Sequence, residues 1–418
     1  MPSLPDAVTA PVRATSAGYQ ALLVALLSLN FGILFFDRNA ASFLMPFVQP
    51  ELGLSNTQVG LAASSLSFTW ALAALAIGAI ADRAGRRKAL LIGATCAFSL
   101  CSFLTGLAAS FATLLGARLL MGCAEGGVAP VSQTLTALAV RPERRGLAMG
   151  IMQNFGSNLL GSFVAPVVLV SFAQAYGWRR AFFLAGVPGL VSALLLWRVV
   201  REPAATRRIE APAPQRLRGI LAHRNLGLCM AIAVLLVAYL VTCWTFAPLF
   251  LTRVRGYSAE SMSWLMGTLG LSATVTSMLV PAWSDRIGRR PVLIAIAYLG
   301  AVLPLGALFF GGSVWLLALI FFVGWALVGL FPLFMGTIPA ESVGPRDMTT
   351  AMALVMGSGE VLGGTLAPAL AGGAADRWGL AAPLWIMLGS CLGAGTLALG
   401  LIETAPARRS AAPALDVR

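Results

Sequence analysis

Five ionisable residues lie inside long apolar runs, where a charge is costly: Asp37, Arg38, Arg118, Glu125 and Glu360. A charged side chain at the bilayer centre costs about 2.5–3.5 kcal/mol on insertion scales, so these positions are the best pointers to function. An arginine keeps its proton and matches the geometry of carboxylate ligands. A carboxyl group in an apolar pocket can bind and release a proton near neutral pH. These residue types can therefore exchange protons and bind an anion wherever the fold brings them into one hydrated chamber.

Spacing relates two of these charges on one helix. Arg118 and Glu125 are seven residues apart, which places them two turns apart on nearly the same face. Glu125 lies roughly 20 Å along its predicted helix and therefore near mid-membrane. An alternative is a purely structural role, in which Asp37 pairs with a guanidinium and Glu125 pairs with Arg118 to hold the helices together.

Other polar or aromatic side chains in apolar runs are candidate substrate contacts. Asn154 and Asn158 are one turn apart and either bind substrate or form interhelical hydrogen bonds. Glu360 stands among glycines as a second proton site, a selector of a cationic substrate group, or a partner of backbone and hydroxyl groups. Tyr239 and Trp244 are candidate contacts whose orientation the sequence does not give.

The composition requires a lipid environment. Hydrophobic residues make up 58% of the 418-residue chain and charged residues only 11%, against about 25% in soluble proteins. Twelve segments are long enough to cross a bilayer, and they predict an all-α integral membrane protein with twelve transmembrane helices. The predicted spans are 18–48, 57–80, 88–109, 112–138, 146–171, 180–200, 224–251, 258–282, 290–311, 313–338, 347–373 and 380–403.

A charged turn occurs twice, 203 residues apart, each time between two apolar runs. Asp82 aligns with Asp285, Arg83 with Arg286, Gly85 with Gly288, and Arg86 with Arg289. Such duplication predicts two six-helix bundles with a substrate path between them. The predicted parts are a cytoplasmic N-terminal tail (1–17), a first bundle (18–200), a cytoplasmic linker (201–223), a second bundle (224–403) and a cytoplasmic C-terminal tail (404–418).

The repeated turn also suggests a conformational latch. Gly78 allows close helix contact, Gly85 allows a tight turn, and Asp82 can accept hydrogen bonds from a helix N-terminus and from arginines. The predicted latch comprises Gly78, Asp82, Arg83, Gly85, Arg86, Asp285, Arg286 and Arg289. Alternatively, the arginines only anchor the topology. With both termini cytoplasmic, 22 of the 29 basic residues fall on the cytoplasmic side and five on the other, as the positive-inside rule requires.

These motifs resemble those of the major facilitator superfamily over essentially the whole chain. The turn from Gly78 to Lys88 matches the family's loop between helices 2 and 3, and residues 281–290 match the loop between helices 8 and 9. Asp37–Arg38, together with Arg118, Gly122, Glu125 and Gly126, also resembles the anion:cation symporter branch. That resemblance implies that helices 1 and 4 line a cavity, with the two acids coupled to protons and the arginine to the anion. Spinster-type lipid transporters share these motifs, so the two branches stay open.

The expected function is proton-coupled symport of a small organic anion, such as a sugar acid, across a bacterial inner membrane. We expect a monomer embedded in membrane lipid, with protons as the coupling ion and no cofactor or metal. The alternatives are an exporter of lipids or amphipathic drugs on the same fold, and a non-transporting receptor or scaffold. The sequence has no P-loop, metal-ligand spacing or nucleophile–base set, so neither an enzyme nor an ATP-driven pump is expected. The basic residues lie in short loops, which argues against nucleic-acid binding.

Overall fold

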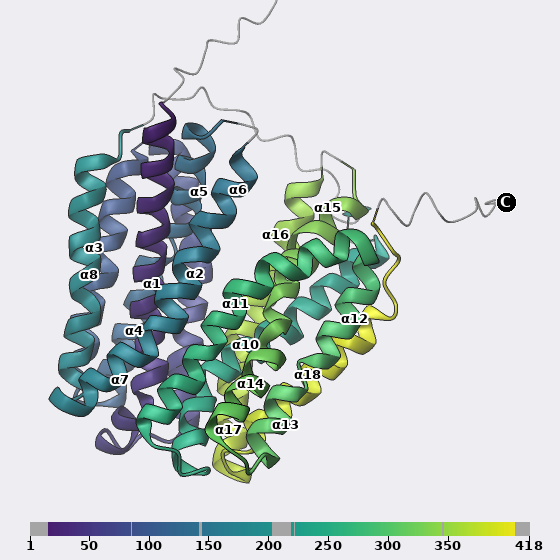
Figure 1. Cartoon of the computed structure of the whole chain (residues 1–418). Helices are drawn as coiled ribbons and strands as arrows, with labels where there is room; N and C mark the ends of the chain where they lie inside the picture. The colour runs from purple at the N-terminus through teal and green to yellow at the C-terminus, as the bar shows by residue number, and fades with distance from the viewer. Residues whose placement is uncertain are drawn as a thin grey trace, which may run out of the picture.

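The computed structural model describes residues 16–84, 86–141, 144–202, 219–220, 222–344 and 347–405, and all regular structure in these ranges is helical. The helices form two bundles, one from each half of the chain (Figure 1). The predicted bounds of the two bundles stay a prediction, and most of the predicted tails and linker lies outside the described residues.

The first bundle contains helices from residues 17 to 199. Its elements are α1 (Ala17–Glu51), α2 (Asn56–Ala84), α3 (Arg87–Gly106), α4 (Phe111–Glu125), α5 (Val128–Ala139), α6 (Arg145–Gly150), η2 (Ile151–Phe155), η3 (Ser157–Val164), α7 (Ala165–Tyr176) and α8 (Trp178–Val199). Several of these follow one another directly and make up a single long span.

The second bundle repeats this order from residue 224. Its elements are α10 (Arg224–Arg253), α11 (Ala259–Ile287), α12 (Arg289–Leu299), α13 (Val302–Phe309), α14 (Val314–Gly324), η4 (Trp325–Leu330), η5 (Leu333–Thr337), α15 (Ile338–Ser342), α16 (Met348–Ser358), η6 (Gly359–Gly364), α17 (Thr365–Trp378) and α18 (Ala382–Ala398).

Among the described residues, ten helical segments are long and apolar enough to cross a membrane. The helices α2, with 29 residues, and α18, with 17, occupy the second and twelfth predicted positions. The all-helical membrane architecture is therefore confirmed, while a crossing by all twelve segments stays a prediction.

Serine caps and positive-φ glycines define several helix ends. The side chains of Ser16, Ser110 and Ser258 each accept a backbone N–H in the first turn of α1, α4 and α11. Such a cap satisfies one of the N–H groups that a helix start leaves unpaired. Gly177 and Gly379 turn the chain after α7 and α17 with φ of 86° and 82°, values that favour glycine. Their corresponding positions support the duplicated architecture.

Glycines bring helices into close contact at corresponding places in the two bundles. A Cβ atom on Gly156 would lie 1.9 Å from the carbonyl oxygen of Ser28, so α1 packs directly on the start of η3. A Cβ atom on Gly363 would lie 2.4 Å from the carbonyl oxygen of Val234, where η6 meets α10. Small residues allow this backbone approach in membrane helices. Both η3 and η6 are π-helical, a form that often marks functional sites.

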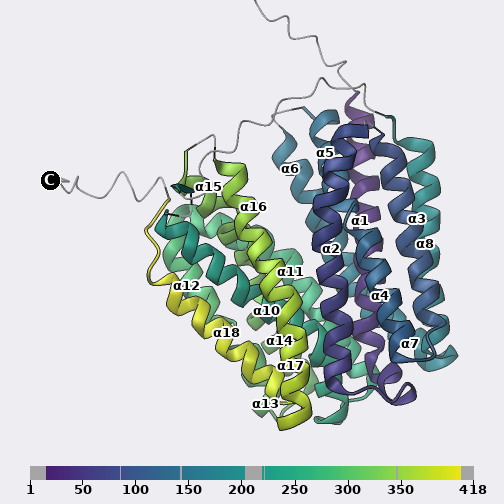
Figure 2. The same cartoon turned by 180° about the vertical axis from the view of Figure 1, so that it is seen from behind.

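The two bundles meet at one end of the molecule and diverge toward the other. Figure 2 shows α2 and α17 side by side, in agreement with their extensive contact, whereas α6 and α16 stand apart in both views (Figures 1 and 2). The rings of Phe43 in α1 and Trp244 in α10 contact each other across the two bundles, with centroids 5.6 Å apart. Residues of α1, α2, η3, α10, α11 and η6 therefore face the region between the bundles.

Candidate functional site

Asp37 lies fully buried inside the first bundle. The hydroxyl oxygen of Ser102 in α3 is 2.5 Å from Asp37 Oδ1 and 3.0 Å from the carbonyl oxygen of Phe182 in α8. A hydroxyl group has one proton to donate. Both contacts are therefore full hydrogen bonds at once only when Asp37 is protonated and donates to Ser102. With Asp37 ionised, Ser102 donates to the carboxylate and the contact with Phe182 is lost.

Arg38, the next residue along α1, pairs with Glu125 of α4. Its Nη1 atom is 3.4 Å from Glu125 Oε2. Its guanidinium carbon lies 5.8 Å from the ring centroid of Phe35 and 5.4 Å from that of Trp70, within cation–π range. The Arg38 side chain is 18% exposed and that of Glu125 is fully buried. Arg38 is thus the arginine of the cluster that remains accessible.

Arg118 is buried, at 2% exposure, and donates from Nη2 to the hydroxyl of Thr105 at 2.9 Å. Its guanidinium carbon lies 5.8 Å from the ring centroid of Phe182. Among the described residues, no ion pair within 4 Å involves Arg118 or Asp37. The alternative pairing of Glu125 with Arg118 is therefore wrong, because Arg38 reaches Glu125 instead.

Three polar atoms of this cluster are buried without a hydrogen-bond partner among the described residues. They are Asp37 Oδ2, Glu125 Oε1 and Arg118 Nε. Burying a charge costs several kcal/mol unless a partner and further hydrogen bonds compensate. A purely structural cluster would be expected to satisfy these atoms, so their lack of partners points to a chemical role.

Glu360 extends from η6 of the second bundle toward the first. A Cβ atom on Gly364 would lie 3.2 Å from Glu360 Oε2 and 3.7 Å from Ser67 Cβ in α2. The positive charge of Arg38 interacts electrostatically with the Glu360 carboxyl group. Within the described ranges, no hydrogen bond or ion pair is recorded for the Glu360 carboxylate. Arg38 is thus linked to one acid of its own bundle by an ion pair and to one acid of the opposite bundle by charge alone.

The predicted amide ligands lie along the span that contains η2 and η3. Asn154 is exposed and donates from Nδ2 to the carbonyl oxygen of Gly150 at 3.3 Å. Asn158 is partly buried, and its backbone carbonyl oxygen would lie 2.8 Å from a Cβ atom on Gly270 of α11. Both residues are therefore on the span that meets the opposite bundle.

The two predicted aromatic contacts have different positions. Trp244 is partly exposed and touches both Phe43 of the first bundle and Trp325 of η4. Tyr239 is fully buried, and its hydroxyl donates to the carbonyl oxygen of Gly300 at 2.8 Å. The Tyr239 hydroxyl is therefore satisfied inside the second bundle, and a contact of Tyr239 with substrate stays a prediction.

Sequence reasoning missed the third span as a source of site residues. Ser102 contacts Asp37, and Thr105 contacts Arg118. Ser99, Ser102 and Thr105 recur every three residues within the apolar run, a helical spacing that places hydroxyls on one face. This row of hydroxyl groups in an apolar run could have indicated that the third span faces the buried charges.

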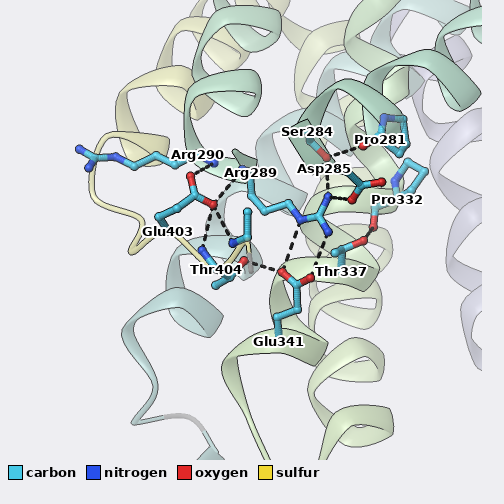
Figure 3. A network of polar contacts seen from close by, with 11 residues as sticks. Pro281, Ser284, Asp285, Arg289, Arg290, Pro332, Thr337, Glu341, Glu403 and Thr404 are labelled. Atoms are coloured by element: carbon cyan, nitrogen blue, oxygen red, sulfur yellow. Dashed lines mark hydrogen bonds and ion pairs between the residues drawn. The ribbon is translucent and has the colours of Figure 1, made fainter. Parts of the chain in front are cut away.

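The second copy of the repeated turn forms a polar network at one end of the second bundle (Figure 3). The Arg289 guanidinium pairs with Asp285, donates to Ser284 Oγ at 2.7 Å and reaches Glu341 Oε1 at 3.1 Å. Thr404 Oγ1 donates to Glu341 Oε2 at 2.6 Å. The network therefore joins α11, α12, α15 and the segment after α18.

Glu403 caps α12 in the same network. Burial would raise the pKa of Glu403, but the backbone N–H groups of Ala405, Arg289, Arg290 and Thr404 hold it below its usual value. In the first bundle, Glu202 accepts the backbone N–H groups of Arg87 at 2.7 Å and Lys88 at 3.0 Å. A carboxylate thus caps the helix after the charged turn in both halves.

The first copy of the turn is only partly described. The backbone of Gly78, Asp82 and Arg83 belongs to α2. The side chains of Asp82 and Arg83, the surroundings of Gly78 and all of Gly85 lie outside the described part of the structure. Arg86 directly precedes α3, and Arg286 is exposed. The contacts recorded for Asp285 and Arg289 stay within the second bundle, so a latch between the bundles at this end stays a prediction.

Comparison with known proteins gives the family. Residues 27–261 and 230–416 match the family model of the Major Facilitator Superfamily. The chain belongs to this superfamily. It is 32% identical over 293 residues to a hexuronate transporter of Bacillus subtilis (strain 168), covering 64% of this chain and 68% of that protein. It is 29% identical over 444 aligned positions to a gallate transporter of Pseudomonas putida, covering 96% and 95% of the two chains.

A solved structure supports the fold. A bacterial homologue of the human lysosomal transporter Spinster, in an inward-facing and unoccupied conformation, superposes with a TM-score of 0.73 at 20% identity, covering 93% of this chain and 95% of that one. The predicted superfamily resemblance is therefore confirmed. The chain is an integral membrane protein of a transporter family, and the relatives named above are transporters rather than enzymes.

Proposed function

We propose that this protein is a proton-coupled symporter of a small organic anion that works by alternating access. One observation carries the proposal: Arg38 pairs with the buried Glu125 of its own bundle at 3.4 Å, and its side chain remains 18% exposed. A guanidinium in this position suits a carboxylate ligand. The names of the relatives, a hexuronate transporter and a gallate transporter, favour the same substrate class.

Proton binding would control the availability of Arg38. When Glu125 is ionised, it holds the guanidinium at 3.4 Å. Protonation of Glu125 removes that charge, and the guanidinium is then free to bind the substrate carboxylate. Asp37 binds a second proton, and its contact with Ser102 links its protonation to α3 and α8. Symport follows if substrate binds well only when the acids are protonated.

Arg118 has a different place in this scheme from the one that the sequence suggested. Arg118 is 2% exposed, as buried as Asp37 and Glu125, whereas the Arg38 side chain is 18% exposed. In our proposal, Arg118 balances the charges of Asp37 and Glu125, and Arg38 binds the anion. Since the charges of Arg118, Asp37 and Glu125 act on one another, Arg118 influences substrate binding through the acids.

The second bundle would complete the site. Glu360 provides either another proton site or an acceptor for a hydroxyl or cationic group of the substrate. Trp244 provides an aromatic surface beside Phe43, and Asn154 and Asn158 provide amides from the span that contains η2 and η3. We place the protein as a monomer in a bacterial inner membrane with both termini cytoplasmic, so that the bundles diverge toward the cytoplasm.

Uptake by proteoliposomes tests the proposal. The substrates are glucuronate, gallate, 3-(3-hydroxyphenyl)propionate and sulfoacetate, each with and without an imposed inward proton gradient. We expect the gradient to drive accumulation of at least one acid, and we expect Glu125→Gln or Asp37→Asn to abolish accumulation while leaving exchange. Glu260→Gln, which removes an exposed acid from the first turn of α11, is the matched control and should behave as wild type.

Two outcomes would reject the proposal. Accumulation that ignores the gradient would exclude proton coupling. Failure to take up any of the acids, together with transport of a fluorescent lipid or a lipophilic cation, would favour the alternative of a lipid or drug exporter. That alternative is compatible with the Spinster-like fold and with the shared charge motifs, but the names of the relatives favour an organic acid.

A further inference from the structure

At the end where the bundles meet, α2 and α17 make a polar contact whose residues are not part of the candidate substrate site. Asp376, in the last turn of α17, accepts the backbone N–H of Asn56 at 2.9 Å and that of Thr57 at 2.8 Å. The Thr57 hydroxyl also donates to Asp376, at 2.5 Å. A carboxylate of the second bundle thus binds the first turn of a helix in the first bundle.

This contact completes the capping of α2. A helix start leaves its first N–H groups without partners inside the helix and carries a partial positive charge. Ser55 Oγ accepts the N–H of Gln58 at 3.1 Å, which satisfies one of these groups. Asn56 and Thr57 supply the preceding two N–H groups, and both point to Asp376. If the bundles separated here, these two groups would lose their protein partner.

The same two helix faces are in close backbone contact further along. A Cβ atom on Gly372 would lie 2.4 Å from the carbonyl oxygen of Asn56, and one on Gly60 would lie 2.1 Å from that of Pro368. These approaches leave no room for even a methyl group. The two helices therefore touch over several turns, and opening this end requires them to part.

The contact face of α17 continues to the candidate site. Glu360, Gly364, Pro368, Gly372 and Asp376 follow one another at every fourth position. Gly364, Pro368 and Gly372 approach Ser67, Gly60 and Asn56 of α2 in turn, so the contact with α2 continues along this span. A movement of this span that releases Asp376 would therefore also move Glu360 relative to the first bundle.

We propose that Asp376 is a latch that holds this end of the transport path closed, and that its release from α2 is a step in opening that end. The inference rests on the proposed alternating access but names a residue set outside the substrate site. Residues 376–379 read Asp-Arg-Trp-Gly, the same Asp-Arg-x-Gly pattern as at Asp82 and Asp285. Asp376 stands three residues before Gly379, and the first bundle has the uncharged Gln174 three residues before Gly177. The corresponding helix end of the first bundle therefore lacks this carboxylate.

Distances between spin labels at this end test the latch. The labels are placed at Ala109→Cys in the connection between α3 and α4 and at Gly311→Cys between α13 and α14, in a variant without the six native cysteines that is first shown to retain uptake. We expect one main distance, and we expect Asp376→Ala to raise the ratio of longer to shorter distances about two- to fivefold. Losing a helix cap has a moderate effect, and solvent weakens it at an exposed carboxylate.

Two further variants make the result interpretable. Thr57→Val removes one of the three hydrogen bonds and should shift the ratio in the same direction by less, which keeps the test valid if Asp376→Ala folds poorly. Glu260→Gln removes an exposed acid from α11 at the same end and should leave the distances unchanged. An unchanged distance distribution in both Asp376→Ala and Thr57→Val would overturn the latch.

The two proposals fail separately. Wild-type uptake that ignores the proton gradient, together with shifted distances in Asp376→Ala, would reject proton coupling and retain the latch. Gradient-driven uptake with unchanged distances would retain the symporter and reject the latch.

Discussion

At the scale of residues, the candidate site depends on Arg38, which pairs with the buried Glu125 and whose side chain remains partly exposed. Asp37, Arg38 and Glu125 stood out because charges are rare in apolar runs. Which arginine reaches Glu125 depends on how α1 and α4 rotate against each other, and packing determines that rotation. Tyr239 shows the same limit, since its orientation depends on the carbonyl group of Gly300 in a distant segment.

Arg38→Lys tests the proposed anion site. Lysine keeps the positive charge but lacks the planar fork that binds a carboxylate through two hydrogen bonds and stacks on Phe35 and Trp70. We expect the KM for the transported acid to rise about tenfold or more, equivalent to ~1.4 kcal/mol of binding. Initial uptake rates over a range of substrate concentrations measure this. Arg180→Lys, at an exposed position, is the control, and an unchanged KM in Arg38→Lys would remove the anion site from Arg38.

At the scale of elements, hydropathy predicted the spans well, because twenty apolar residues in lipid have few options besides a helix. The predicted span 224–251, for example, is α10, Arg224–Arg253. The π-helical segments were not predicted, since they arise where helices press together. In η3 and η6, close glycine contacts accompany the change of helix type.

Gly156→Ala tests the contact between α1 and η3. The added methyl group would lie 1.9 Å from the carbonyl oxygen of Ser28, so the two helices must separate. We expect a loss of stability of about 1–3 kcal/mol, as for other overpacked sites. Gly150→Ala is the matched control, because nothing lies within 4 Å of its new methyl group and alanine favours the helix. Thermal unfolding in detergent should give a lower Tm for Gly156→Ala only, and equal Tm values for the two variants would contradict the packing argument.

At the scale of the whole molecule, the repeated turn predicted the duplication but not the arrangement of the bundles. Repeated residues such as Asp82 and Asp285 indicate two like halves in any conformation. The end at which the halves meet depends on contacts between bundles, such as those of Asp376 with α2. Such conformations differ by only a few kcal/mol, which a local sequence pattern does not encode.

The orientation of the protein in the membrane determines which compartment the diverging ends of the two bundles face. Five basic residues, Arg179, Arg180, Arg253, Arg255 and Arg377, lie near helix ends on the side where α2 and α17 meet, and 22 are predicted for the opposite side (Figure 1). This asymmetry favours cytoplasmic termini. Green fluorescent protein fused after Arg418 should therefore fluoresce, and alkaline phosphatase fused there should be inactive. Phosphatase fused after Tyr257, between α10 and α11, should be active. The reverse pattern would place the meeting point of the bundles in the cytoplasm, so that this structure would be open to the outside.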